Sequence, residues 1–385
     1  MSMIEFLAFW LLIFLLVHLG GEAAARRYRP VSREDEIHFV DTEDGWRLAL
    51  HRYHPRGPDP HGEPVLLHHG LAATHASFDL GLSGTGVPAL AHWLAGKGYD
   101  VWVCDLRGRP DSRKPGEVRY DWCVDDYIDR DDPAIVAAIL SHSAYADLHW
   151  IGHSMGGILL LCHLARHGSE RIASGITVGS SLSYHGTGGA FAPLLPFVRL
   201  AIGVGKVPAG YLSRLWAPFA GRFSNPIETF NYWLPNMTPE ASRAVKASLA
   251  DFVSGRVLAQ LASTYTPEGM TNYEGTFHFM AHLSGVSTPV LLLGGDRDRQ
   301  CPPAAVAASL AALGNGPHEM RIFGTDEGNA THYGHFDLLC GRHAEAEVYP
   351  HLLDWLTCHR ARRKGGGARS PASPPLNDRG DGRGG

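Results

Sequence analysis

The chain has 385 residues, of which 44% are hydrophobic and 19% are charged, and its formal net charge is −5. This composition supports a buried core and argues against a nucleic-acid-binding protein, which normally presents a basic face. The six cysteines form no C-x-x-C pair, and no group of cysteines and histidines has zinc-ligand spacing. We therefore expect mostly reduced thiols, no metal and no organic cofactor.

The N-terminal segment, residues 1–25, is hydrophobic. Its uninterrupted apolar part, FLAFWLLIFLLV, approaches the length of about 20 residues typical of a membrane-spanning helix once its neighbours are added. RRYR at residues 26–29 favours an uncleaved anchor with this flank on the cytoplasmic side. A signal peptide cleaved near AAA at residues 23–25 is the alternative, although the segment lacks the usual basic start. We expect membrane association through this segment, or export after cleavage.

The chain from residue 35 to 360 alternates strand-like and helical runs. The strand-like runs are residues 37–40, 46–52, 65–69, 100–104, 148–151, 172–178, 290–293 and 320–323. The helical runs are residues 88–96, 133–142, 155–167, 303–313 and 345–356. This alternation predicts an α/β fold in which helices cover both faces of a mostly parallel sheet and ligands bind at the carboxyl ends of its strands.

Two regions depart from this alternation. Residues 184–284 are rich in proline and aromatic residues, as in FAPLLPFVRL and FNYWLPNM, which predicts a largely helical cap inserted over the carboxyl edge of the sheet. Residues 361–385, ARRKGGGARSPASPPLNDRGDGRGG, are dominated by glycine, proline, serine and arginine. We expect this tail to be disordered.

The stretch WIGHSMGG at residues 150–157 contains the pattern G-x-S-x-G between a predicted strand and a predicted helix. That context is the one in which a sharp, strained turn exposes a nucleophilic serine. Gly152 and Gly156 remove side chains that would clash in this turn, and the following helix directs N–H groups toward Ser154. Ser154 is therefore the candidate nucleophile.

A serine hydroxyl needs a base, and this type of turn is followed along the chain by an acid and then a histidine. After the strand PVLLLGG, either Asp296 or Asp298 could face the site. We favour Asp298, because G-x-x-D followed by proline is the usual layout for the acid that accompanies this type of turn. Of the histidines in THYGHFDLLCG, His335 precedes an apolar run that would anchor its loop, whereas His332 is expected to be a loop residue.

An oxyanion formed during acyl transfer needs N–H donors. The backbone N–H of Met155, directly after the candidate nucleophile, should supply one. The second should come from Leu71, which follows an early strand in VLLHHGLAA. The side chains at these two positions matter less than the N–H groups.

Four sequence blocks resemble the α/β-hydrolase superfamily, and within it the acid-lipase and steryl-ester-hydrolase branch of gastric and lysosomal lipases. The blocks are HHGLAATHASF, LAGKGYDVWVCDLRG, YIDRDDPAIVAAIL and GHFDLLCGRHAEAEVYPHLLDWL. The chain departs from the pattern at Met155, where acid lipases usually have glutamine, and at Arg109-Pro110, where many hydrolases have His-Gly. The likeness covers most of residues 36–360, and it is loose in the cap.

The resemblance implies an α/β-hydrolase fold with a Ser154–His335–Asp298 triad that cleaves carboxylic esters, lipid-like ones above all, through an acyl-enzyme. Two alternatives remain open. One is an acyltransferase on the same fold, although the polyester synthases of this superfamily use cysteine where this chain has serine. The other is a non-catalytic lipid-binding protein.

Overall fold

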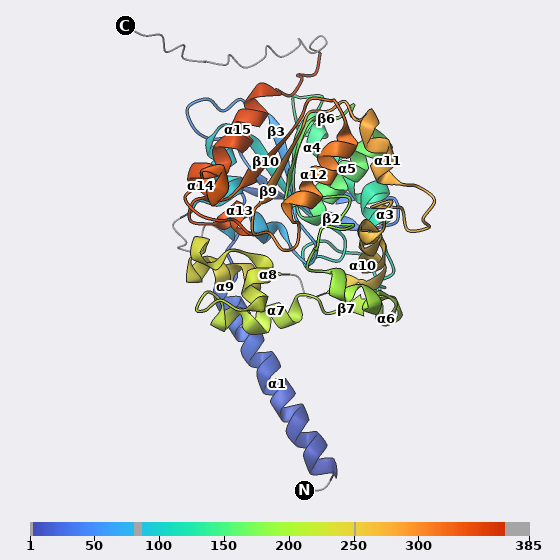
Figure 1. Ribbon diagram of the computed structural model, residues 1–385, viewed down its shortest axis with the longest axis vertical. Coiled ribbons are helices and arrows are strands. Elements are labelled where there is room, and N and C mark those ends of the chain that lie inside the picture. The colour runs from blue at the N-terminus through green and yellow to red at the C-terminus, as the bar shows by residue number, and fades with distance from the viewer. Residues whose placement is uncertain (1–2, 81–86, 250–251, 366–385) are drawn as a thin grey trace.

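The computed structural model describes residues 3–80, 87–249 and 252–365 and is built around an eight-stranded sheet (Figure 1). Its strand order is β1-β2-β4-β3-β5-β6-β9-β10. Strands β1 and β2 pair antiparallel with their neighbours, and the other six run parallel. The strands are β1 (Glu36–Asp41), β2 (Arg47–Tyr53), β3 (Pro64–His68), β4 (Asp100–Asp105), β5 (Leu148–His153), β6 (Ile172–Val178), β9 (Val290–Gly295) and β10 (His318–Phe323).

Helices cover both faces of this sheet, and a hydrophobic core lies on each side. Because side chains alternate along a strand, Leu66 of β3 enters one core while Val65 and Leu67 enter the other. The first core is closed by α4 (Asp132–Ser141), α5 (Met155–His167) and α12 (Pro303–Leu313). The second is closed by α2 (Leu90–Gly96), α13 (Asp337–Cys340), α14 (Ala344–Glu347) and α15 (Tyr349–Cys358).

The predicted fold class is confirmed. Each of the eight strand-like runs coincides with a strand of the sheet, and the five helical runs coincide with α2, α4, α5, α12 and the pair α14–α15. The central strands are buried along their whole length, which explains why they read as continuous apolar runs rather than as alternating ones.

The chain between β6 and β9 leaves the sheet and forms short helices. They cover the end of the sheet where β5 terminates, since residues from several of them line the same cavity as Ser154. A two-residue ladder joins β7 (Lys206–Val207) to β8 (Val253–Ser254) within this region. The longer helices are α6 (Val198–Val204), α7 (Tyr211–Trp216), α8 (Pro226–Asn231), α9 (Pro239–Ser248) and α10 (Gly255–Leu261). We call residues 184–284 the cap.

Helix α1 (Met3–Tyr28) projects from the cap side of the molecule (Figure 1). Its stretch Ala8–Tyr28 is long and apolar enough to cross a membrane, by length and composition. The last turns of α1 contact the cap: His18 Nδ1 lies 2.9 Å from the hydroxyl of Tyr211, and Glu22 Oε1 lies 2.9 Å from Arg214 Nη2.

The first residues of the expected tail are ordered. Arg362 forms an ion pair with Asp147 at 2.7 Å, and Lys364 donates to the carbonyl of Leu140. The body of the protein therefore continues to residue 365, five residues beyond the boundary at 360 expected from composition. The remainder of that expected tail, residues 366–385, lies outside the described residues.

Candidate active site

Ser154 lies at the turn between β5 and α5. Its backbone has φ 56° and ψ −121°, a combination that side-chain-bearing residues rarely adopt. Such outliers persist only where the surroundings fix them, and they gather at functional sites. The backbone N–H of Ser154 donates to the carbonyl of Val178 at 2.9 Å, which ties the turn to the neighbouring strand β6.

Glycine is required on both sides of this turn. A Cβ atom at Gly152 would lie 2.3 Å from the carbonyl carbon of Gly156, and one at Gly156 would lie 2.1 Å from the carbonyl oxygen of His68. Both distances are too short for any side chain. The two glycines therefore let β5 and α5 approach closely enough to present the serine at the tip of the turn.

The predicted acid and base lie together. His335 Nδ1 is 2.7 Å from Asp298 Oδ2, and both side chains are buried. The other oxygen of Asp298 accepts hydrogen bonds from the backbone N–H groups of Gln300, at 2.8 Å, and Cys301, at 2.9 Å. These bonds fix the carboxylate, which in turn orients the imidazole.

Asp296 contacts a different histidine, His332. Its Oδ2 lies 2.5 Å from His332 Nδ1, and its Oδ1 accepts from the backbone N–H of Tyr333 at 3.0 Å. Neither Asp296 nor His332 lines the cavity that contains Ser154. The turn after β9 thus directs these two acids, only two residues apart, to different histidines.

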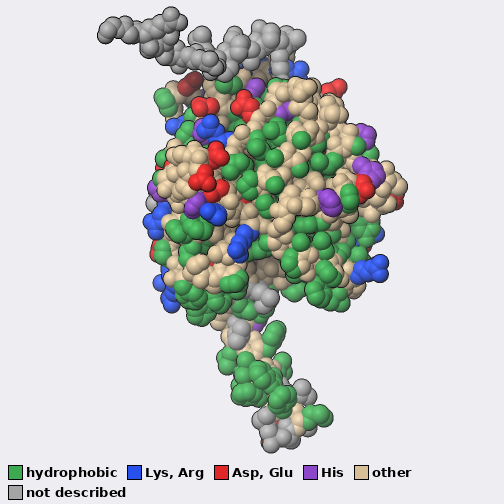
Figure 2. Space-filling model, in the orientation of Figure 1, with side chains coloured by type: hydrophobic (Ala, Val, Ile, Leu, Met, Phe, Trp, Pro, Cys, Tyr) green, Lys and Arg blue, Asp and Glu red, His purple; other side chains and the backbone are tan. Residues whose placement is uncertain are grey.

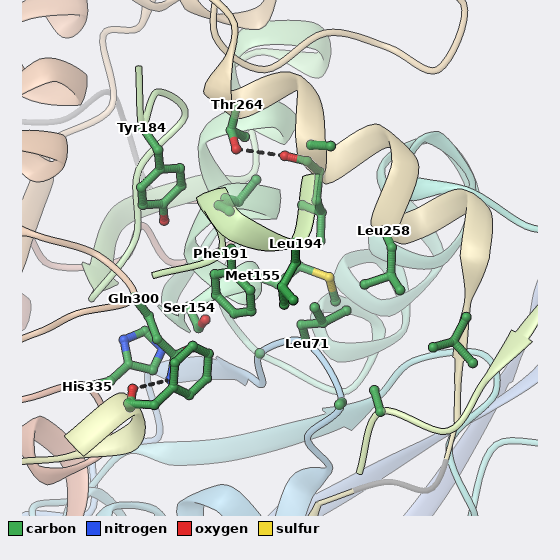
Figure 3. Close-up of a pocket in the computed structure, with 18 of the residues that line it drawn as sticks. Leu71, Ser154, Met155, Tyr184, Phe191, Leu194, Leu258, Thr264, Gln300 and His335 are labelled. Atoms are coloured by element: carbon green, nitrogen blue, oxygen red, sulfur yellow. Dashed lines mark hydrogen bonds between the residues drawn. The ribbon is translucent and has the colours of Figure 1, made fainter. Parts of the chain in front are cut away.

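The second nitrogen of the His335 ring is free to act. Its Nε2 is buried and has no hydrogen-bond partner among residues 3–80, 87–249 and 252–365. His335 and Ser154 lie side by side on the cavity wall (Figure 3). With Nδ1 held by the carboxylate, Nε2 is the atom that can accept a proton from a nearby hydroxyl.

Two groups outside the predicted set hold His335 in place. His153 Nε2 lies 3.2 Å from the backbone carbonyl of His335, and burial lowers the pKa of His153 well below its usual value, so this ring is neutral. Asp337 accepts from the backbone N–H of Gly334 at 2.9 Å and from that of Trp233, in the cap, at 3.2 Å. Burial raises the pKa of Asp337 to about 7.

Both predicted oxyanion donors adjoin the serine. Met155 is the first residue of α5, where the helix leaves its N–H without an internal acceptor. Leu71 follows Gly70, at which a Cβ would lie 2.8 Å from the Cβ of Ser154, so this loop runs directly beside the serine. Within the described parts of the chain, the N–H of Leu71 donates no hydrogen bond.

The cavity beside Ser154 has a volume of about 530 Å³ and is lined mainly by apolar side chains of the cap (Figure 3). Ser154, His335 and Gln300 lie close together on one side of the cavity, and Thr264 lies apart from them (Figure 3). A mainly apolar chamber with a nucleophile and a base on one side suits a ligand with a long apolar part and one polar reacting group. The apolar lining includes Phe191, Leu194, Leu195, Phe197, Val198, Leu258 and Leu261.

Gly179, which directly follows β6, belongs to no motif that predicts a site residue. Its φ is +61°, and a Cβ there would lie 2.9 Å from His335 Nδ1 and 3.0 Å from Asp298 Oδ2. A glycine directly after a buried strand was the available signal, because close backbone approach is a common reason for glycine at that point.

A second group of side chains has no spacing in the sequence that would predict a site. His51, His75, Asp105 and Asp111 come from separate segments, yet one ligand atom from each lies within 4.8 Å of the others. Metal motifs are recognised by short, regular spacing, and these residues are spread over about 60 positions.

Known proteins resemble this chain over most of its length. A family model described as the α/β hydrolase fold matches residues 63–339, and one described as a partial α/β-hydrolase lipase region matches residues 31–81. A lipase of Caenorhabditis elegans is 25% identical over 372 residues, covering 83% of this chain and 87% of that protein. The human lysosomal acid lipase/cholesteryl ester hydrolase is 31% identical over 132 residues, which are 31% of this chain and 32% of that protein. Several other curated lipases also align over about a third of their own length.

Solved structures resemble it in fold. An esterase from Rhodococcus sp. superposes with a TM-score of 0.52 at 18% identity, covering 84% of this chain and 99% of that one. The predicted resemblance to lipases of the lysosomal type is confirmed by the curated relatives, and the sheet, its helices and the matched family model agree. The chain belongs to the α/β-hydrolase fold family.

Proposed function

We propose that this chain is a serine hydrolase that cleaves carboxylic esters of lipid-like substrates, with Ser154 as nucleophile, His335 as base and Asp298 as orienting acid. The observation that carries the proposal is the 2.7 Å contact between His335 and Asp298, because His335 lines the same cavity as Ser154, which stands in a strained turn. The lipases and esterases among the chain's relatives support the same reaction class.

In the acylation step, His335 Nε2 removes the hydroxyl proton of Ser154 as Oγ attacks the ester carbonyl. The N–H groups of Leu71 and Met155 stabilise the oxyanion, for which the loss of one donor typically costs about 10²–10³ in rate. His335 then gives its proton to the leaving alcohol, and the acyl group stays on Ser154. Water, deprotonated by His335, attacks this acyl-enzyme and releases the acid, while Asp298 stabilises the imidazolium in both steps.

The apolar cavity supports a lipid-like acyl group. It extends from the serine between α6 and α10, and its wall there carries no charged side chain among the described residues. Burial of apolar surface contributes about 25 cal/mol per Å², so each additional methylene placed in this chamber strengthens binding. We expect esters of medium and long acyl chains to be preferred over acetate.

The cap surface and α1 support docking on a membrane. Figure 2 shows hydrophobic side chains gathered at the cap end of the molecule, around the base of α1, which is itself largely apolar. A contiguous apolar surface of this kind marks an interaction site, here with lipid. The large hydrophobic side chains exposed on the cap are Leu194, Phe197, Leu200, Ile202, Val204, Phe219, Phe223 and Ile227.

The contacts of α1 favour an anchor over a cleaved signal peptide. Cleavage after residue 25 would remove Glu22 from the buried Arg214 and His18 from Tyr211. A segment destined for removal has no need of such partners in the folded protein. On this proposal the anchor holds the cap against the bilayer, so the substrate reaches the cavity directly from lipid.

The proposed reaction is tested by hydrolysis of p-nitrophenyl esters from acetate to palmitate, with Ser154→Ala beside the wild type. The wild type should turn over and be labelled by a fluorophosphonate probe, and the variant should do neither. Inertness of the wild type toward every ester and toward the probe would overturn the proposal. Transfer to an added alcohol faster than hydrolysis would instead identify an acyltransferase.

Membrane docking needs a separate measurement. Leu200→Asp places a charge on the exposed side of α6, where 66% of the leucine surface is open. Hydrolysis of a diacylglycerol embedded in phosphatidylcholine vesicles should fall, while turnover of soluble p-nitrophenyl butyrate should stay within twofold. Equal loss on both substrates would count against a membrane-facing cap.

A further inference from the structure

Four metal-binding side chains converge beside the loop that carries Leu71. His51 belongs to β2, His75 begins the short helix η1 (His75–Phe78), Asp105 ends β4, and Asp111 lies in the loop after it. One ligand atom from each lies within 4.8 Å of the others. None of the four lines the cavity around Ser154, so the cluster is separate from the candidate active site.

One buried atom of the cluster lacks a partner. His51 is 1% exposed, and its Nε2 forms no hydrogen bond with any residue that the structure describes. This nitrogen lies 3.6 Å from Asp105 Oδ2 and 3.7 Å from Asp111 Oδ2. A buried nitrogen facing two carboxylates at distances too long for hydrogen bonds calls for a further group between them.

We propose that His51, His75, Asp105 and Asp111 bind one Zn²⁺ ion. Zinc bonds of about 2.0–2.2 Å in a tetrahedral site separate the ligand atoms by roughly 3.3–3.5 Å. Of the six pairs of ligand atoms, three lie at 3.6, 3.7 and 3.7 Å, one, His75 Nδ1 to Asp105 Oδ2, at 2.8 Å, and the other two within 4.8 Å. The His75 ring and the Asp105 carboxylate must therefore move apart by about 0.5 Å to admit the ion. Two imidazoles favour zinc over calcium or magnesium, which prefer oxygen ligands.

The neighbours of the four ligands suit this role. His51 Nδ1 lies 3.3 Å from Glu34 Oε1, so this carboxylate can accept the ring proton at Nδ1 when a metal takes Nε2. Asp105 Oδ1 accepts from the backbone N–H of His75 at 2.8 Å, which leaves Oδ2 for the metal. Carboxylate–histidine–metal arrangements of this kind orient the ligands of many zinc sites.

A proton competes with the metal. Burial opposes a charge on His75, but the Asp105 carboxylate outweighs this and raises the pKa of His75 to about 9. Zinc must therefore displace a proton from this ring at neutral pH, which lowers the apparent affinity. Asp111 is 43% exposed and gives solvent a path to the cluster.

A metal bound at this site would fix the loop that carries Leu71, the proposed oxyanion donor. His75 lies four residues after Leu71, and the two are joined by a loop whose Ala72 has a φ of +53°. His69, two residues before Leu71, accepts from the backbone N–H of Leu106 next to Asp105. A metal bound between β2, β4 and η1 would thus hold both ends of this loop against the sheet.

The test uses the full-length protein in detergent, stripped with EDTA and titrated with Co²⁺ and Zn²⁺. We expect one Co²⁺ per chain with the visible d–d bands of a tetrahedral site, displacement by Zn²⁺, and a higher Tm for the zinc-loaded protein. Asp111→Asn, at a partly exposed loop position, should weaken Co²⁺ binding by at least about tenfold. His54→Gln is the matched control, because His54 directly follows β2 and its partly exposed side chain also lies near a carboxylate, 3.1 Å from Glu36.

His75→Gln supplies a second variant with a ligand removed. Absence of tetrahedral bands in the wild type would overturn the proposal, as would Co²⁺ affinity unchanged in both folded variants. Equal weakening by His54→Gln would assign the binding to surface histidines. Because the readout is the metal spectrum, the result is independent of ester hydrolysis and of the proposed function.

Discussion

His335 Nδ1 lies 2.7 Å from Asp298 Oδ2, whereas His332, three residues earlier, pairs with Asp296. Two carboxylates in the same turn thus pair with two histidines in the same loop, and of these two histidines only His335 lines the cavity with Ser154. The Asp296–His332 pair can therefore serve as a control for the role of Asp298, because it has the same chemistry but does not line the cavity.

Asp298→Asn should lower kcat for p-nitrophenyl butyrate by about 10⁴, with little change in KM. An asparagine amide can hold His335 in the wrong tautomer, in which Nε2 carries the proton and cannot act as base. Asp296→Asn disrupts the matching pair at His332 and should retain kcat within about threefold. Comparable losses in the two variants, both with wild-type Tm, would refute the assignment of Asp298.

Local patterns were sufficient to predict the sheet and the serine turn. The β5–α5 unit illustrates why, since a buried six-residue strand, a G-x-S-x-G turn and a helix with an apolar face are all encoded within residues 148–167. The order of acid and histidine along the chain then narrowed the remaining candidates to two carboxylates and two histidines.

Contacts between distant segments could not be predicted from such patterns. The ring of His153 lies 4.6 Å from that of His335, 182 residues later, and His51 faces Asp105 only because β2 pairs with β4. Composition also predicted that the body ends at residue 360, because an arginine- and glycine-rich segment is typical of disorder. Composition does not reveal that Arg362 forms an ion pair with Asp147. Side-chain partners across the fold depend on packing that no single segment encodes.

Gly70→Ala should impair catalysis by displacing the nucleophile. A Cβ at this position would lie 2.8 Å from the Cβ of Ser154 and 3.3 Å from its Oγ, so the loop, the serine or both must shift. We expect kcat/KM to fall by about 10²-fold, since displacements of about 1 Å can cost that much. Gly96→Ala, where a Cβ meets open space, should leave kcat/KM unchanged. Wild-type activity in Gly70→Ala would show that the loop adapts freely.

The C-terminal segment should make the protein's stability sensitive to acid through Glu63. Burial opposes ionisation of this side chain, but a hydrogen bond from His149 and one from the backbone N–H of Ala361 outweigh it and lower the pKa of Glu63 to about 2. Because the pKa is lower in the folded state than the ordinary 4.5, the stabilisation is complete above pH 4.5 and is lost as the pH falls toward 2.

Glu63→Gln should therefore reduce the free energy of unfolding by about 2 kcal/mol at pH 7, after allowance for solvent screening. The difference from wild type should shrink as the pH falls from 4.5 toward 3. Urea unfolding of both proteins at several pH values measures this, and Glu117→Gln, at an exposed position, is the control. A difference that stays constant with pH would mean that the loss comes from packing and not from the charge.

The length of acyl chain that the enzyme accepts should depend on Leu258. This α10 side chain lies across the cavity from His335 (Figure 3), where the far end of a long acyl chain would reach. Leu258→Trp fills that end, so kcat/KM for palmitate should fall on the order of tenfold relative to butyrate, a range typical of altered apolar pockets. Butyrate, which occupies only the part near Ser154, should be hydrolysed at the wild-type rate.

Leu200→Trp is the matched control for this change, because Leu200 lies on the adjacent α6 but is 66% exposed and does not line the cavity. The same residue added outside the chamber should leave the ratio of palmitate to butyrate unchanged. If both tryptophan variants shifted the ratio equally, chain length would be selected at the cap surface. If neither did, the acyl group would lie along another wall of the cavity, and only the alcohol part of the ester would approach α10.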